Sequence, residues 1–237
     1  SVDIPTIMDK GELDITFTVQ NIGLTTIESF TASYLDISSK DDYSRTMKEE
    51  TFTASLAPME TKQFTFSESI TLNPGTYNLP IEIINVNNTA DDGNDNNDLT
   101  KKFFVAMSNT NRIPMIEHFS SSTCGPCVSV NYAMNQLTAA NPGKYTYVKY
   151  QMNWPGSGDA YYTEEGGVRR DYYGVNAVPW LYFDADNINN TTQSIFDEYY
   201  ANPAFADVRG AFNIEGNTIN ITADFMSYAQ MNNVRAF

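Results

Sequence analysis

The only two cysteines of the 237-residue chain, Cys124 and Cys127, are separated by two residues. An apolar segment, residues 113–119, leads into this pair, and a helical pattern leads out of it. Two thiols at this spacing on a strand-to-helix turn are typical of redox chemistry. The alternatives are a structural cross-link and half of a metal site, but a metal site needs further ligands and the chain holds a single histidine. We interpret the pair as redox-active.

The position of the two cysteines on the predicted helix also indicates which sulfur reacts first. The reactive species is a thiolate, and the start of a helix favours negative charge through its free N–H groups and its dipole. Cys124 is therefore expected to attack a substrate disulfide, and Cys127, one turn on, to resolve the mixed disulfide. Pro126 between them is compatible with the first turn of a helix. These residues do not fix the direction of exchange.

The segments around the cysteine pair alternate between strand and helix patterns. Residues 113–119 are apolar enough for a central strand that is covered on both faces. Val130, Met134 and Leu137 recur at helical spacing, which predicts an amphipathic helix over residues 126–140. The elements expected after it are a strand at 145–152, a helix at 159–173, a strand at 177–183 and a helix at 192–200.

This order of elements resembles the thioredoxin-like family. The tetrapeptide Cys124-Gly125-Pro126-Cys127 is identical to the active-site motif of thioredoxins, and residues 173–179 (YGVNAVP) are similar to the family's approach to its cis-proline loop. The resemblance implies a thioredoxin-like domain over residues 109–206. It also implies that the Val178–Pro179 bond is cis, and that Val178 and Pro179 face the sulfurs and bind the backbone of the substrate.

Three features depart from the family pattern. Thr123 stands where thioredoxins usually have a tryptophan, and His118 stands where the family often has a buried aspartate. Residues 154–165 lengthen the link between the second strand and the proline loop. These departures point away from a cytosolic thioredoxin. The chain looks more like the secreted thiol–disulfide oxidoreductases of Bacteroidetes that carry an N-terminal immunoglobulin-like domain.

Three residues are candidates for a proton relay. His118 could accept the proton that Cys127 must lose, and its alternative role is that of a hydrogen-bonded core histidine. Glu117 is the alternative acid. By the resemblance, Lys149 occupies the position where thioredoxins often pair a lysine with the buried acid. The Arg169–Asp171 stretch is expected either to fix a helix to the sheet or to form a surface charge pair.

Residues 1–108 have the pattern of an all-β sandwich. Leu13, Ile15, Phe17 and Val19 alternate with polar residues, which predicts a half-buried strand. Further short strands follow, separated by turns, and no helix-length amphipathic pattern occurs before residue 112. The order resembles an immunoglobulin-like, adhesion-type sandwich.

An acidic loop interrupts this half at residues 85–98. Its oxygen donors surround one glycine, which suits a hard cation such as Ca²⁺; they are Asp91, Asp92, Asn94, Asp95 and Asp98. The spacing of an EF-hand is not met, because no acid stands where the twelfth ligand should be. The alternative, which we favour, is a polar hairpin loop, because turns select Asn, Asp and Gly.

Residues 207–237 alternate around the turn at 215–217, which predicts a β-hairpin that begins a further, truncated β-region. The expected fold class is therefore multi-domain: an all-β immunoglobulin-like sandwich, an α/β thioredoxin-like domain and a C-terminal β-hairpin.

The composition bounds the partners and the location. The net charge is −15, of which −10 lies in residues 1–108, and this excludes the basic footprint that nucleic-acid binding needs. No run of 18 apolar residues occurs, so no transmembrane segment is expected in this chain. The abundance of Asn, Thr, Tyr and Asp is typical of secreted bacterial proteins. We expect an extracytoplasmic protein, in the periplasm or at the outer membrane or cell surface, anchored by a removed N-terminal segment.

The expected function is a thiol–disulfide oxidoreductase that exchanges protein disulfides, in the reducing direction, through its dithiol. It would need no cofactor and no metal, and its partners would be a disulfide-containing protein and a separate electron donor. The alternative is a surface-attached binding or adhesion protein that uses the thioredoxin fold as a scaffold.

Overall fold

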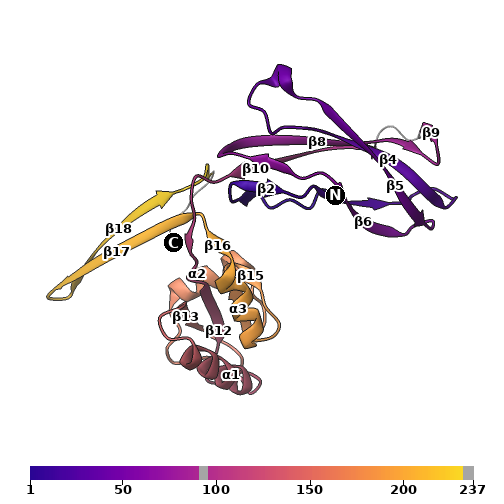
Figure 1. Cartoon of the computed structure of the whole chain (residues 1–237). Coiled ribbons are helices and arrows are strands. Elements are labelled where there is room, and N and C mark those ends of the chain that lie inside the picture. The colour runs from indigo at the N-terminus through magenta and orange to yellow at the C-terminus, as the bar shows by residue number, and fades with distance from the viewer. Residues whose placement is uncertain (91–95, 232–237) are drawn as a thin grey trace. The chain divides into compact units, whose positions relative to one another are not determined.

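The structure is a computed structural model that describes residues 1–90 and 96–231 (Figure 1). The chain divides into two compact units, one formed by Ser1–Asn109 with Phe205–Phe237 and the other by Thr110–Ala204.

Within residues 1–109 and 205–231, leaving out 91–95, the first unit consists mainly of strands, with a 3₁₀ helix at Asp42–Ser44. Its elements are β1 (Ile7–Met8), β2 (Gly11–Leu13), β3 (Thr16–Gln20), β4 (Ile27–Leu35), η1 (Asp42–Ser44), β5 (Met47–Leu56), β6 (Thr61–Thr65), β7 (Ile70–Leu72), β8 (Gly75–Val86), β9 (Thr89–Ala90), β10 (Asp98–Val105), β17 (Ala206–Glu215) and β18 (Thr218–Ser227).

These strands form one large sheet and several two-stranded sheets. The large sheet has the order β1-β10-β8-β4-β5, with β9 paired to β8. All of its pairs are antiparallel except β1 with β10. Strands β2 and β7 form one antiparallel pair, and β3 and β6 form another.

The core of this unit contains aromatic as well as aliphatic side chains, which the alternation of each strand turns inward. Phe17 of β3 lies opposite Phe64 of β6 in the register. Phe30 of β4 packs against Phe64 with ring centroids 4.8 Å apart and against Phe52 of β5 at 5.1 Å. The β3–β6 pair therefore packs on the large sheet through stacked and edge-to-face rings, which are favourable aromatic geometries.

Strands β17 and β18 form a two-stranded sheet of their own in a continuous register from Ala206↔Ser227 to Glu215↔Thr218. One of its faces is apolar and open to solvent; for example, the Phe212 side chain is 73% exposed. The expectation that this hairpin begins a further β-region stays a prediction, as do the predicted domain boundaries.

The second unit holds the three helices of the described chain and a four-stranded sheet. Its elements are β11 (Thr110–Asn111), β12 (Met115–Ser120), α1 (Cys127–Ala140), β13 (Thr146–Gln151), α2 (Glu164–Tyr173), β14 (Trp180–Phe183), β15 (Asp186–Asn187), α3 (Gln193–Ala201) and β16 (Pro203–Ala204). The sheet order is β13-β12-β14-β15, with β12 parallel to β13 and antiparallel to β14. A short β11–β16 pair joins the ends of the unit.

Alternation along β12 divides the core of this unit into two clusters. Ile116 packs with α1 and α3 through side chains such as Met134 and Phe196. Phe119 packs on the opposite face, with a cluster that includes Tyr173 from the end of α2. The central strand is therefore covered on both sides, as its largely apolar sequence predicts.

Helix α2 begins later than its sequence pattern suggests. The expected start was Asp159, but the helix begins at Glu164, where the Thr163 side chain caps it by accepting from the Gly166 N–H at 3.1 Å. The preceding residues are held in an irregular segment by the Asp159 side chain, which binds backbone N–H groups outside the helix. The helix ends at Tyr173 and is capped by Gly174, whose φ of 65° suits the left-handed cap.

The expected fold class, with an α/β thioredoxin-like domain between a sandwich and a hairpin, is wrong. Strands hold 45% of the residues and helices 16%, and the three helices are short, so the chain is a mostly β protein of several sheets. The helical patterns overstated the helix content because part of the 159–173 pattern forms an irregular segment instead. The cation hypothesis for the acidic loop remains untested, because Asp91, Asp92, Asn94 and Asp95 lie outside the described residues.

Candidate redox site

Cys124 and Cys127 are joined by a disulfide at the start of α1. Cys127 is the first residue of the helix and is fully buried, whereas Cys124 is 4% exposed. The Cys127 N–H points at the Cys124 sulfur, with a nitrogen-to-sulfur distance of 3.2 Å. A negative charge on Cys124 would therefore meet a backbone donor directed at it, which is the arrangement that favours a thiolate.

The proline loop lies against the same sulfur. The Val178 carbonyl oxygen is 3.5 Å from Cys124 Sγ, and the Val178–Pro179 peptide bond is cis, as the resemblance implies. Strand β14 begins directly afterwards at Trp180. The structure thus brings Cys124, Cys127 and Val178 together, although the cysteines and the proline loop are about fifty residues apart in the sequence.

The loop before Cys124 is held by the segment that lengthens the link between β13 and α2. The Thr123 hydroxyl donates to the Pro155 carbonyl at 2.6 Å, and the Ser122 N–H donates to Asp159 Oδ2 at 2.6 Å. Asp159 Oδ1 also accepts from the Tyr161 N–H at 2.9 Å. The hydrogen bond from the Tyr161 backbone, followed by that from Ser122, lowers the pKa of Asp159 against the opposing effect of its burial. Asp159 is therefore held as a carboxylate that fixes the turn.

Sequence reasoning identified the length of this segment but missed Asp159. The signal in the sequence was the position of Asp159 in a polar, glycine-containing stretch, where an aspartate side chain often accepts a hydrogen bond from the backbone N–H two residues later. That pattern indicates a local turn but does not show that Ser122 is the second donor. Thr123, which the comparison with thioredoxins marks as unusual, takes part in the same contact through Pro155.

His118 is fully buried on the face of β12 that points towards α1. Its Nδ1 lies 2.8 Å from the Tyr147 hydroxyl, and its Nε2 has no hydrogen-bond partner among the described residues. Burial, with a smaller contribution from the charge of Lys149, lowers the pKa of His118 to about 4. The ring is therefore neutral at physiological pH.

This burial predicts an acid-sensitive contribution to stability. His118 has an unfolded pKa of 6.5 and a folded pKa of about 4, so between these values the unfolded chain binds a proton that the folded chain does not. The contribution is fully present above pH 6.5 and is lost as the pH falls to 4, by about 3 kcal/mol. Urea unfolding at several pH values should show it.

The matched variant for this measurement is His118→Gln, which keeps a partner for Tyr147 but does not titrate. Its free energy of unfolding should change less than that of the parent chain between pH 6.5 and 4. Parallel pH profiles for the two proteins would contradict the prediction.

Glu117 lies on the opposite face of β12 and is 2% exposed. Arg169 of α2 binds both of its oxygens, with Nε to Oε1 at 2.6 Å and Nη2 to Oε2 at 3.0 Å. The hydroxyls of Tyr150 and Tyr173 donate to the same carboxylate at 3.1 and 2.6 Å. Burial would raise the pKa of Glu117, but the hydrogen bonds from Arg169 and Tyr173 and the charge of Arg169 outweigh it, and the pKa is lowered.

The three relay candidates are therefore not assembled into one site. His118 and Glu117 face opposite sides of β12, and Lys149 is an exposed residue opposite His118 in the register. Among the described residues, no hydrogen bond joins any of the three to a cysteine sulfur. The Arg169–Asp171 stretch fulfils both of its expected roles, because Arg169 ties α2 to β12 while Arg170 forms an exposed pair with Asp171.

Comparisons with known proteins add little. No family model and no curated protein matches the chain. One solved structure that it is similar to is a CARDB domain of a Pyrococcus furiosus protein in complex with di-metal ions, at 19% identity and a TM-score of 0.35. That match covers 45% of this chain and 90% of the other. Separately, no helix within residues 1–90 and 96–231 is long and apolar enough to cross a membrane.

Proposed function

We propose that the chain catalyses thiol–disulfide exchange with protein substrates through Cys124 and Cys127. The observation that carries the proposal is the disulfide at the first turn of α1, with the Val178 carbonyl 3.5 Å from Cys124 Sγ. A bond used only as a cross-link would gain little here, because it closes a loop of only a few residues and the loop-closure entropy that a disulfide removes from the unfolded chain grows with loop length. A short-range disulfide at the start of a helix is better suited to reversible reduction and oxidation.

In the proposed reaction, the reduced protein acts first through the Cys124 thiolate. It attacks one sulfur of a substrate disulfide, so that a Cys124–substrate disulfide forms and the other substrate sulfur leaves as a thiolate that takes up a proton. The Cys127 thiolate then attacks Cys124 Sγ and releases the second substrate thiolate. Two electrons pass to the substrate, and the protein is left with the Cys124–Cys127 disulfide. A dithiol donor returns it to the reduced state.

The supporting features are the Cys-Gly-Pro-Cys motif and the proline loop, both shared with the thioredoxin-like family. Under this proposal Cys124 Sγ and the Val178 carbonyl receive an extended segment of the substrate, since a backbone carbonyl can accept from a substrate N–H. The location is outside the cytoplasm, and the partners are a disulfide-containing protein and a separate electron donor. Acceptance of the Cys127 proton by His118 stays a prediction, and the lowered pKa of His118 argues against it.

Turnover of a model substrate tests the proposal. Insulin reduction with dithiothreitol as the electron donor should be accelerated by the wild-type chain and not by a Cys124→Ser/Cys127→Ser double variant, which has neither thiol. The reduction potential of the pair, measured against glutathione, should lie within the range of redox-active dithiols. No turnover by a protein whose dithiol is accessible to a thiol reagent would reject the enzyme in favour of a binding protein.

A further inference from the structure

An irregular segment between β13 and α2 is tied to the end of β12, just before the turn that carries the cysteines. The Met152 N–H donates to the Ser120 carbonyl at 2.8 Å, and the Asp159 N–H donates to the Met152 carbonyl at 2.9 Å. Gly158 has a φ of 78°, and a Cβ on it would lie 2.5 Å from the Asn153 backbone. The close turn of this segment therefore requires glycine at that position.

The segment binds the two residues that directly precede Cys124. Asp159 Oδ2 accepts from the Ser122 N–H, and the Pro155 carbonyl accepts from the Thr123 hydroxyl, both at 2.6 Å. Asp159 is buried, so its carboxylate makes these contacts in a place that water reaches poorly. The position of Cys124 therefore depends on a segment that lies more than thirty residues later in the sequence.

Asp159 also brings a charge to a part of the chain that is otherwise almost uncharged. Residues 119–143 and 172–183, which include the turn, α1 and the proline loop, contain no acidic residue, basic residue or histidine. Two residues of chain span at most about 7 Å, so the carboxylate bound to the Ser122 N–H lies within about 10 Å of the Cys124 backbone. Over that distance, physiological salt screens a charge only in part.

The ionisable groups of β12 and β13 do not cancel this charge. His118 is neutral, because burial lowers its pKa to about 4, and Glu117 is paired with Arg169. Lys149 is exposed, and among the effects that lower the pKa of Asp159 the hydrogen bond from the Tyr161 N–H is the largest and the charge of Lys149 the smallest. Asp159 therefore stays charged in the neutral range.

Helix α2 and the tyrosines of the neighbouring strand add no positive charge that is free to offset Asp159. Arg170 lies over the Trp154 ring at 5.3 Å and is paired with Asp171. Glu164 and Glu165, in the first turn of α2, are exposed acids. Tyrosine side chains such as Tyr147, whose pKa burial raises to about 12, are neutral at physiological pH.

We propose that Asp159 is a positioning residue that fixes Cys124 and, through its charge, favours the disulfide over the dithiol, so that the reduced pair passes its electrons to a substrate. A fixed negative charge raises the free energy of the Cys124 thiolate, which exists only in the reduced state. This effect opposes that of the helix start, which stabilises the thiolate. The inference rests on the proposed function and supplies a physical cause for the direction of exchange.

The equilibrium with glutathione tests this effect. Two glutathione thiols are oxidised to one glutathione disulfide, while the Cys124–Cys127 disulfide takes up the two electrons and two protons to become two thiols. After acid quenching, reversed-phase chromatography separates the oxidised chain from the reduced chain. At pH 7, Asp159→Asn should shift the equilibrium towards the dithiol by about threefold or more. An unchanged equilibrium in a correctly folded variant would overturn the proposal.

The pH dependence separates the charge of Asp159 from its role in holding the turn. The rate at which iodoacetamide alkylates Cys124 in the reduced chain follows the thiolate fraction, and its midpoint should fall by about half a pH unit in Asp159→Asn. The two glutathione equilibria should converge as the pH falls below these midpoints, since Cys124 is then a neutral thiol in both proteins. A purely structural role would change the limiting rate at high pH and leave the midpoint in place.

Further variants of the same segment provide the controls. Asp159→Ser is a second neutral variant that still offers an acceptor to a backbone N–H, and it should shift the equilibrium in the same direction. Asp159→Glu keeps the charge and should remain closer to the parent chain. Thr123→Val removes the hydrogen bond to Pro155 without a change of charge, so the alkylation midpoint should not move.

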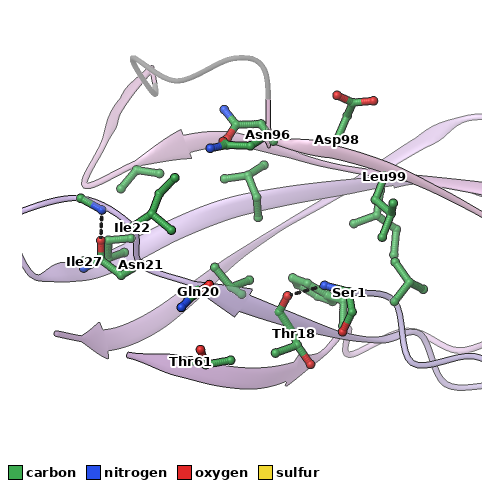
Figure 2. A pocket seen from close by; sticks show the side chains of 18 of the residues that line it. Ser1, Thr18, Gln20, Asn21, Ile22, Ile27, Thr61, Asn96, Asp98 and Leu99 are labelled. Atoms are coloured by element: carbon green, nitrogen blue, oxygen red, sulfur yellow. Dashed lines mark hydrogen bonds between the residues drawn. The ribbon is translucent and has the colours of Figure 1, made fainter. Parts of the chain in front are cut away.

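The matched control for net charge lies in the first unit. Asp98 is one of the residues that line a groove of about 740 Å³ there (Figure 2), and Asp98→Asn removes one carboxylate without changing residues 110–204. Its glutathione equilibrium should equal that of the parent chain. An equal shift in Asp98→Asn and Asp159→Asn would mean that net charge, and not the position of Asp159, is responsible, which overturns the proposal.

Insulin turnover gives a separate decision on the proposed function. If the parent chain does not reduce insulin, the proposed function fails, while the glutathione equilibria still decide whether Asp159 favours the disulfide. If the parent chain reduces insulin and folded Asp159→Asn keeps both the parent equilibrium and the parent alkylation midpoint, only the role of Asp159 is overturned. Circular dichroism of each variant establishes that it is folded.

Discussion

Replacing Cys124 by serine is expected to reduce insulin turnover to background, a loss on the order of 1,000-fold or more, because the attacking sulfur is removed. Cys127→Ser is expected to give an equally poor catalyst for a different reason, since the mixed disulfide forms but cannot be resolved. The difference follows from the environments of the two sulfurs. Cys127 is fully buried, whereas Cys124 is 4% exposed and its sulfur receives the Cys127 N–H.

The two variants are distinguished by whether they capture the substrate as a mixed disulfide, not by their turnover. After incubation with insulin, Cys127→Ser should migrate on a non-reducing gel as an adduct that dithiothreitol releases, and Cys124→Ser should not. Mass spectrometry of the adduct should place the substrate on Cys124. A stable adduct on Cys127 in the Cys124→Ser chain, at a similar yield, would contradict the proposed order of attack.

The turn that carries Cys124 and Cys127 was predictable because its determinants are local. The spacing of Cys124 and Cys127 and the apolar period of Val130, Met134 and Leu137 are readable within a few turns of chain, and α1 begins within one residue of the expected position. The proximity of Val178 to Cys124 was predicted only through the family resemblance, because no local sequence pattern links residues about fifty positions apart.

The contacts that hold the turn were not predictable, because they depend on tertiary structure. The sequence pattern predicts that a helix starts at Asp159, yet its carboxylate accepts a hydrogen bond from the Ser122 N–H in a distant loop. Tertiary hydrogen bonds of this kind override local helix preference, which is a weak determinant of structure. The same effect contributed to the error in fold class, because helix-like periodicity was counted where the chain is irregular.

The contacts of Glu117 could not be predicted from the sequence either. Its position beside His118 suggested a proton relay, whereas strand alternation places the two side chains on opposite faces. The partners of Glu117 are Arg169 and two tyrosines from later elements, and these could not be paired with it by sequence spacing. Its structural role makes it the site of the largest stability change that we expect.

Glu117→Leu is expected to lower the free energy of unfolding by about 3–5 kcal/mol, because Arg169 would be left in a largely buried position without its carboxylate. Arg169→Leu should cost a similar amount. The double variant Glu117→Leu/Arg169→Leu should recover much of the loss, since removing both charges also removes the cost of burying them. Urea unfolding of the four proteins gives the coupling directly, and additive losses would show that the two residues do not act as a pair.

The same ion pair makes a second prediction through pH. The pKa of Glu117 is below its ordinary value of 4.5, so its contribution is fully present above pH 4.5 and is lost as the pH falls through the lower folded pKa. The contribution of His118 is lost earlier, between pH 6.5 and 4. Acid should therefore weaken the second unit in two stages, and Glu117→Leu should remove only the later one while His118→Gln removes only the earlier. Loss of both stages in either single variant would mean that the two faces of β12 titrate as one coupled system.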